Sequence, residues 1–208
     1  MHKKAVIFDL DNTIYSVHSI GEEVFASLFA LILKNGNHAQ NIDKIKDEIM
    51  RKPFQLVARE YDFSEDLTTK GTALLKDLEY TGKIEPFDDY RFVKDLAVDK
   101  FLVTTGFLKL QQSKIEGMKI RNDFKEIHIV DPSTSDQTKK DVFGEIIETY
   151  GYDKSEVLVV GDDPHSEIKA AQDLGIDAVL YNKLNLNKRI TSIREINSFE
   201  ELAVVVVA

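Results

Sequence analysis

Residues 5–13 read Ala5-Val6-Ile7-Phe8-Asp9-Leu10-Asp11-Asn12-Thr13, an apolar run that passes directly into acidic and polar residues. A short, nearly all-apolar run with Val and Ile is typical of a strand that is covered on both faces of a sheet. The two acids follow where this strand ends, and ligand sites of open parallel sheets lie beyond the carboxyl ends of their strands. The stretch therefore predicts a buried first strand with a candidate site at its end.

Further runs of the same kind predict four more strands, at 101–103, 127–130, 157–160 and 178–181. Helix-length segments lie after the second, third and fourth strands, at 107–117, 139–150 and 166–174. Gly151 and Gly175 stand where the last two helices should end, as glycines often do at helix C-termini. Alternating strands and helices predict right-handed βαβ units, and hence a doubly wound, Rossmann-like α/β core.

The C-terminal segment carries two further signals. Ser198-Phe199-Glu200-Glu201 has the spacing of a capping box, which predicts the start of a final helix. The residues that follow, Ala203–Val207, are rich in valine, which favours strands over helices. This last segment therefore fits either a helix packed on the sheet or an edge strand.

The segment between the first two strands is too long for a simple connection. From Tyr15 to Pro86 no run resembles a strand, and amphipathic patterns instead indicate several helices. About seventy residues far exceed the roughly two to six of a usual connection between a strand and a helix. The sequence predicts a helical module at 15–86, inserted into a core formed by 1–14 and 87–208.

Composition and charge exclude several classes of function. The 208 residues include 27 Lys+Arg and 36 Asp+Glu, for a net charge of −9. This balance argues against binding nucleic acid or anionic membranes, because phosphate groups attract clustered cations. The absence of cysteine excludes disulfides, zinc–thiolate sites, iron–sulfur clusters and a cysteine nucleophile. No apolar run reaches the roughly 18–20 residues of a membrane span, so we expect a cytoplasmic, soluble protein.

Polar residues also follow the other predicted strands: Thr104-Thr105-Gly106 after the second, Asp131-Pro132 and then Lys139-Lys140 after the third, and Gly161-Asp162-Asp163 after the fourth. The carboxyl ends of parallel strands share one edge of the sheet, so these segments should converge with Asp9 and Asp11. The expected result is a crevice that contains several carboxylates, a hydroxyl group and an ammonium group.

Carboxylates that are packed together repel one another, and burial increases the repulsion. A divalent cation is the simplest relief, and an all-oxygen ligand set favours Mg²⁺ over zinc or copper. Mg²⁺ typically binds one or two carboxylates together with a substrate phosphate, whose other oxygens the hydroxyl and ammonium groups could bind. These parts suit phosphoryl transfer, in which an aspartate can itself be the nucleophile.

Four motifs in this order resemble those of the haloacid dehalogenase superfamily: Asp9-Leu10-Asp11-Asn12-Thr13, then Thr104, then Lys139, then Gly161-Asp162-Asp163-Pro164-His165-Ser166-Glu167. They span nearly the whole predicted core, and the insert at 15–86 resembles the α-helical cap of the phosphoglycolate-phosphatase-like branch. The resemblance implies a Mg²⁺-dependent phosphatase that hydrolyses a small phosphomonoester metabolite through an aspartyl phosphate.

The resemblance also implies a role for each matching residue. Asp9 would attack phosphorus and bind Mg²⁺, and Asp162 would complete the metal site. Asp11 would protonate the leaving oxygen and later activate water, while its main-chain carbonyl binds the metal. Thr104 would bind the phosphoryl group, and Lys139 would neutralise its charge. The expected substrate-binding positions are Asn12, Thr104, Thr105, Gly106 and Lys139.

Single positions within the motifs bear on the reaction. Dehalogenases of this superfamily lack an acid at the position of Asp11, because a departing halide needs no proton, so Asp11 favours a phosphatase. The related phosphomutases commonly have Val where this chain has Thr13, which favours hydrolysis.

The chain departs from the family pattern at two places. At Glu167 the family usually has Asp, and Asp163 could share the task of that residue. The chain also has Lys139-Lys140 where Lys-Pro is usual, which leaves the motif lysine ambiguous by one residue. Phe143, four residues beyond Lys139, suits the helix that normally follows and favours Lys139.

Two other functions fit parts of this pattern. A receiver-like phospho-switch also combines acids, a threonine and a lysine with Mg²⁺, but such domains have their phosphoacceptor after a later strand and lack a long insert. A catalytically silent binding protein on the same fold is the second alternative, and the presence of both Asp9 and Asp11 argues against it. The identity of the phosphomonoester and the oligomeric state stay open.

Overall fold

A six-stranded parallel sheet forms the centre of the computed structural model, which describes residues 2–187 and 192–207. The strands are β1 (Ala5–Phe8), β2 (Asp99–Thr105), β3 (Glu126–Val130), β4 (Val157–Gly161), β5 (Asp177–Tyr181) and β6 (Arg194–Ile196). Every neighbouring pair is parallel, and the spatial order is β3-β2-β1-β4-β5-β6. This is the order of doubly wound Rossmann-type sheets and differs from the 2-1-3-4-5 order of receiver-type domains. The predicted fold class is confirmed.

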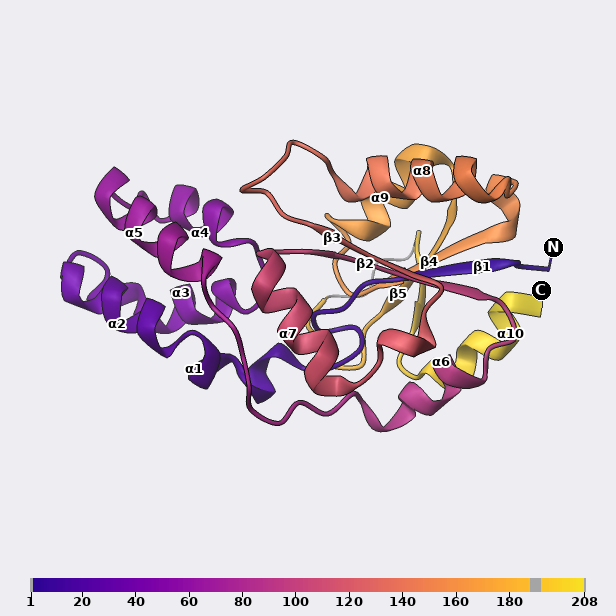
Figure 1. Ribbon diagram of the computed structural model, residues 1–208, viewed down its shortest axis with the longest axis horizontal. Coiled ribbons are helices and arrows are strands. Elements are labelled where there is room, and N and C mark those ends of the chain that lie inside the picture. The colour runs from indigo at the N-terminus through magenta and orange to yellow at the C-terminus, as the bar shows by residue number, and fades with distance from the viewer. Residues whose placement is uncertain (1, 188–191, 208) are drawn as a thin grey trace.

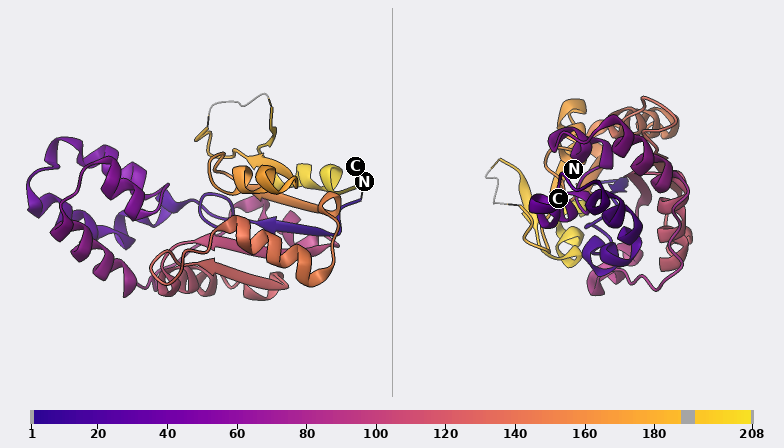
Figure 2. Two further views of the ribbon diagram at one scale, coloured as in Figure 1. Left: turned by 90° about the horizontal axis from the view of Figure 1, so that it is seen from above. Right: turned by 90° about the vertical axis from the view of Figure 1, so that its left-hand side faces the viewer.

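Helices cover both faces of the sheet (Figures 1 and 2). These helices are α6 (Arg91–Asp95), α7 (Leu108–Met118), α8 (Lys139–Tyr150), α9 (Glu167–Leu174) and α10 (Leu202–Val207). Ala5 and Ile7 belong to the hydrophobic cluster with α8 and α9, whereas Val6 and Phe8 belong to the cluster with α6, α7 and α10. Successive strand residues point to opposite faces, so a sheet covered on both sides needs the unbroken apolar runs seen in the sequence.

The ends of these helices follow the sequence signals closely. α8 and α9 end at Gly151 and Gly175, which have left-handed φ angles of 65° and 72°. α7 instead ends with Lys119 in the left-handed region, at φ 56°. The Ser198–Glu201 capping box is present, and a 3-10 turn leads from it into α10. The valine-rich segment is therefore helical, because the capping box satisfies backbone N–H groups at the start of a helix.

Five α-helices lie in the segment between β1 and η3 (Asp88–Tyr90), the 3-10 turn before α6: α1 (Gly21–Val24), α2 (Ala26–Asn35), α3 (Ile42–Ile49), α4 (Phe54–Glu60) and α5 (Glu65–Lys76). They form a lobe at one end of the sheet, and the chain termini lie at the other end (Figure 1). The chain enters and leaves the lobe at one place, where the Phe87 amide donates to the Ile14 carbonyl at 2.8 Å. The division into a 15–86 cap domain and a core domain stays a prediction.

Two short elements were not predicted from the sequence. β6 has only three residues, two of them charged, so no apolar run indicates it. α6 has five residues and follows η3, which residues 77–87 separate from α5. Within residues 2–187 and 192–207, no helix combines the length and the hydrophobicity that a membrane span needs.

Candidate active site

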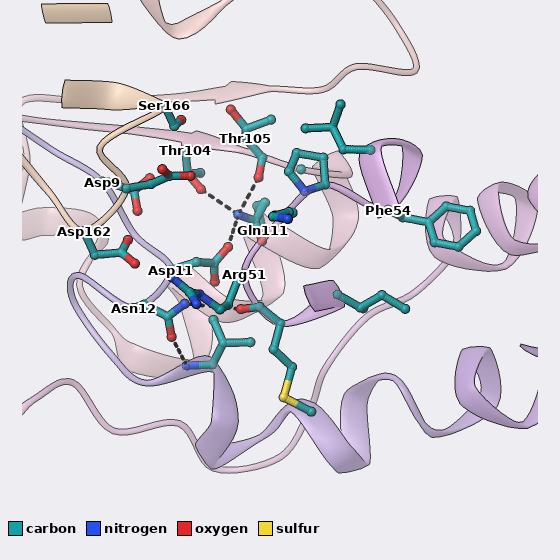
Figure 3. A pocket seen from close by; sticks show the side chains of 18 of the residues that line it. Asp9, Asp11, Asn12, Arg51, Phe54, Thr104, Thr105, Gln111, Asp162 and Ser166 are labelled. Atoms are coloured by element: carbon teal, nitrogen blue, oxygen red, sulfur yellow. Dashed lines mark hydrogen bonds between the residues drawn. The ribbon is translucent and has the colours of Figure 1, made fainter. Parts of the chain in front are cut away.

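The polar residues at the strand ends meet at the sheet edge that faces the helical lobe (Figure 3). A cavity of about 540 Å³ lies there. The residues proposed from the sequence all line it: Asp9, Asp11, Asn12, Thr104, Thr105, Gly106, Lys139 and Asp162. Residues of the α3–α4 region, from Glu48 to Leu56, line the opposite wall. The structure therefore brings together segments that lie more than 150 residues apart in the chain, as Asp9 and Asp162 do.

Three carboxylates and one ammonium group form the centre of this site. Asp9 follows β1, Asp162 follows β4, and Glu167 is the first residue of α9. One carboxylate oxygen of each lies within 4.8 Å of the others. Lys139 Nζ donates to Asp9 Oδ1 at 2.6 Å and to Glu167 Oε2 at 2.7 Å. When all four groups are ionised, the cluster carries two more negative charges than positive ones.

The pKa values of these groups reflect that imbalance. Burial raises the pKa of Asp9 to about 7, with Glu167 adding to the effect and Lys139 opposing it. Burial, Glu167 and Asp9 together raise the pKa of Asp162. Burial works to lower the pKa of Lys139, but Asp9 and Glu167 outweigh it and raise that pKa. A divalent cation would relieve the repulsion, and a set of carboxylate oxygens fits Mg²⁺.

Glu167, rather than Asp163, belongs to the acidic cluster. Its longer side chain folds over Gly161, where an added Cβ would collide with the Glu167 Cγ and Oε1 atoms. Glu167 Oε1 accepts the Asp163 amide at 2.7 Å, which leaves Oε2 to hold Lys139. The Asp163 carboxylate turns instead to the His165 amide, at 2.8 Å. The extra methylene group of Glu167 is thus accommodated by a glycine.

The structure places Lys139, not Lys140, against the acids. Thr138 caps α8 through a capping box with Asp141, which fixes Lys139 as the first residue of the helix. The Lys139 side chain is buried, whereas Lys140 is exposed to solvent. The cap therefore determines which of the two adjacent lysines meets Asp9.

The Asp11 carboxylate has different partners from Asp9. Its Oδ1 accepts from the Tyr15 hydroxyl at 2.5 Å and from Lys114 Nζ at 2.8 Å. Its Oδ2 accepts from Gln111 Nε2 at 2.9 Å. Burial alone would raise the pKa of Asp11, but Lys114, Tyr15 and Gln111 hold it below its ordinary value. The structure thus holds Asp11 in its ionised form.

Gln111 and Lys114 were missed by the sequence analysis. They lie three residues apart on α7, so both face the same side of the helix. The signal was present but weak: both are polar residues on the buried face that also carries Leu110, Ile115 and Met118. The helical periodicity of the sequence identifies the buried face of α7, but it does not show which residues of other elements this face contacts.

Asn12 and Thr104 make contacts that differ in kind. Thr104, near the end of β2, is buried, and its Oγ1 accepts from Gln111 Nε2 at 2.6 Å. Asn12 has a left-handed φ of 59°. Its Oδ1 accepts the Val17 amide at 3.0 Å, and its Nδ2 donates to the Met50 carbonyl at 3.2 Å. Both polar atoms of Asn12 are therefore bound to backbone groups of the segment between β1 and η3, and its contact with substrate stays a prediction.

Comparisons with known proteins identify the family of this chain and structures of similar fold. A family model described as haloacid dehalogenase-like hydrolase matches residues 3–175. No match was found among the curated proteins. The structure of YfnB from Bacillus subtilis, solved bound to magnesium, has a TM-score of 0.67 at 20% identity, over 99% of each chain. A HAD phosphatase from Thermococcus onnurineus has a TM-score of 0.64 at 19% identity, over 97% of each chain.

A third similar structure is that of a dehalogenase and not of a phosphatase. It is the L-2-haloacid dehalogenase from Xanthobacter autotrophicus, with a TM-score of 0.61 at 14% identity, over 98% of each chain. At these identities the structural likenesses show the shared fold alone. The family model, by contrast, covers most of the chain. From that match, the protein belongs to the haloacid dehalogenase-like hydrolase family.

Proposed function

We propose that the protein is a Mg²⁺-dependent phosphatase that hydrolyses a small phosphomonoester through an aspartyl phosphate on Asp9. One observation carries the proposal. The buried carboxylates of Asp9, Asp162 and Glu167 lie close together in the wall of one cavity, and Lys139 donates a hydrogen bond to Asp9. Similar folds include a phosphatase and a dehalogenase. Asp11 favours the phosphatase, because a departing alkoxide needs a proton and a departing halide does not.

The reaction would proceed in two displacements at phosphorus. A carboxylate oxygen of Asp9 attacks phosphorus, the bond from phosphorus to the leaving oxygen breaks, and the phosphoryl group is held as an acyl phosphate. Water then attacks the same phosphorus, which releases inorganic phosphate and restores the Asp9 carboxylate. Lys139 offsets the negative charge near Asp9, and the Thr104 hydroxyl binds a phosphoryl oxygen. Mg²⁺, held by Asp9 and Asp162, would neutralise further charge on the phosphate.

Asp11 would take a proton from the attacking water in the second displacement and would give that proton to the leaving oxygen in the first displacement of the next turnover. The ion pair with Lys114 keeps its carboxylate in the form that accepts a proton. A leaving group that departs as a stable anion does not require a proton in the first displacement. An ester with such a leaving group is therefore the most direct probe of the site.

The direct test is hydrolysis of p-nitrophenyl phosphate by the full chain with Mg²⁺, with EDTA, and with Mg²⁺ restored in excess. We expect turnover that EDTA abolishes and Mg²⁺ recovers, together with release of inorganic phosphate from members of a metabolite panel. A 2-haloacid serves as the control substrate, and we expect no release of halide from it. Folded protein that releases halide but no phosphate would contradict the proposal.

Mg²⁺ should also stabilise the fold, because the native cluster binds it and the unfolded chain does not. At about 100 times its dissociation constant, a ligand adds about 2.7 kcal/mol to the free energy of unfolding. For a chain of this size, that gain raises the melting temperature by roughly 5–10 °C. Calorimetric melting in EDTA and in Mg²⁺ measures the shift.

Two neighbouring acids provide the control for this prediction. Asp162→Asn removes a carboxylate of the cluster and should lose most of the shift. Asp163→Asn changes an acid that binds the His165 amide, outside the cluster, and should keep it. An equal shift in both variants would contradict the assignment of Asp162 as a metal ligand.

A further inference from the structure

One buried amide connects two of the motif side chains. Gln111 on α7 is 1% exposed, and its Nε2 donates to Thr104 Oγ1 at 2.6 Å and to Asp11 Oδ2 at 2.9 Å. A primary amide nitrogen has two hydrogens, so these two short bonds use both of them. The remaining contact, to the Thr105 carbonyl, is long at 3.4 Å. Figure 3 shows Gln111 between the three residues.

The surrounding structure keeps Gln111 in this place. The Asp131 carboxylate, at the end of β3, accepts the Leu108 amide at 2.9 Å and fixes the first residue of α7. An added Cβ at Gly106 would lie 3.1 Å from Gln111 Cγ and Cδ, and Gly106 has a φ of 154°. A side chain at position 106 would therefore crowd Gln111 where it reaches back to β2. One turn further along α7, Lys114 binds the other oxygen of Asp11.

The bond to Thr104 determines where that hydroxyl can donate. A threonine hydroxyl has one hydrogen and two lone pairs. Gln111 occupies a lone pair, so the single hydrogen of Thr104 is directed to another acceptor. Thr104 lines the cavity, where the phosphoryl oxygens of a substrate would be that acceptor.

We infer that Gln111 is a positioning residue, whose two N–H groups orient the Thr104 hydroxyl toward the phosphoryl group and hold the Asp11 carboxylate for proton transfer. This inference rests on the proposed phosphatase function. It assigns Gln111 no contact with the reacting atoms: the residue acts through Thr104 and Asp11. Removing its donors should therefore impair two parts of the reaction that can be measured separately.

The test compares Gln111→Met, which keeps the side-chain length without polar atoms, with Gln111→Glu, which keeps the shape without N–H donors. Gln112→Met is the matched control, since Gln112 is exposed on the same helix. Substrates are p-nitrophenyl phosphate and an alkyl phosphate, whose leaving oxygen needs a proton. We expect kcat/KM to fall about 10-fold for the first and about 100-fold for the second in both Gln111 variants. Gln112→Met should match the wild type.

A second measurement does not depend on turnover. Calorimetric titration with inorganic phosphate in Mg²⁺ should show about 10-fold weaker binding to both Gln111 variants, as it should to Thr104→Val. The Mg²⁺-dependent rise in melting temperature should stay at its wild-type value, which separates positioning from general loss of structure. Equal losses on the two substrates, or wild-type rates and phosphate affinity, would overturn the inference.

The two proposals fail in different ways. Active wild-type protein with active Gln111 variants refutes the role of Gln111 alone. Wild-type protein that binds phosphate through Thr104 and Gln111 but turns over no phosphomonoester refutes the phosphatase and keeps the positioning role at Thr104. Wild-type protein that neither hydrolyses phosphomonoesters nor binds phosphate refutes both.

Discussion

Asp9→Asn is expected to lower phosphatase turnover by about 10⁴-fold or more, because it removes the nucleophile of the first displacement. The amide oxygen that replaces the carboxylate is a poor nucleophile and a weaker metal ligand. The exchange changes little volume, and Asn can still accept the hydrogen bond that Lys139 donates to Asp9. The measurement is kcat for p-nitrophenyl phosphate, with Asp163→Asn as the matched exchange. A wild-type rate in Asp9→Asn would refute the role assigned to Asp9.

The stability of the same variant should depend less on pH than that of the wild type in EDTA. Burial raises the pKa of Asp9 to about 7, above the ordinary value of 3.8. A folded-state pKa above the unfolded one contributes stability that is complete below about pH 4 and is lost as pH rises through about 7. Asn carries no such charge, so Asp9→Asn should lose less stability than the wild type between pH 4 and pH 8. Urea unfolding at several pH values in EDTA measures this difference.

The parts of the site that the sequence predicted are those that the sheet itself brings together. Asp9, Thr104 and Asp162 lie at or just beyond the carboxyl ends of β1, β2 and β4, three neighbouring strands whose apolar runs are visible in the chain. Once those strands are identified as parallel, their ends must share an edge. Local patterns therefore determine this part of the site.

The contacts that were not predicted depend on helix packing instead. Gln111 meets Asp11 across 100 positions of the chain, and Asn12 meets the Met50 carbonyl across 38. A helical period shows which side chains face inward, but the partner depends on how the helix rotates and shifts against the sheet. The three-residue β6 is a similar case, because its pairing with β5 requires the rest of the sheet to be in place.

Lys139→Met is expected to destabilise the fold by about 3–5 kcal/mol, the usual cost of removing one partner from a buried ion pair. Lys139 is 8% exposed and holds two carboxylates, Asp9 and Glu167, at 2.6 and 2.7 Å. Methionine fills a similar volume without a charge, so the loss reports the missing ammonium group and not a cavity. Turnover should fall as well, because the charge beside the nucleophile is lost.

Lys140→Met makes this prediction specific. The two lysines are adjacent, but Lys140 is exposed at the first turn of α8, and exposed substitutions usually change stability by less than about 0.5 kcal/mol. Urea unfolding of both variants at pH 8 in EDTA measures the contrast directly. Equal stability of the two would mean that the ammonium group of Lys139 does not balance the buried acids in solution. Another positive group would then have to offset the negative charge of these acids, because within the described residues Lys139 is the cation that contacts Asp9 and Glu167.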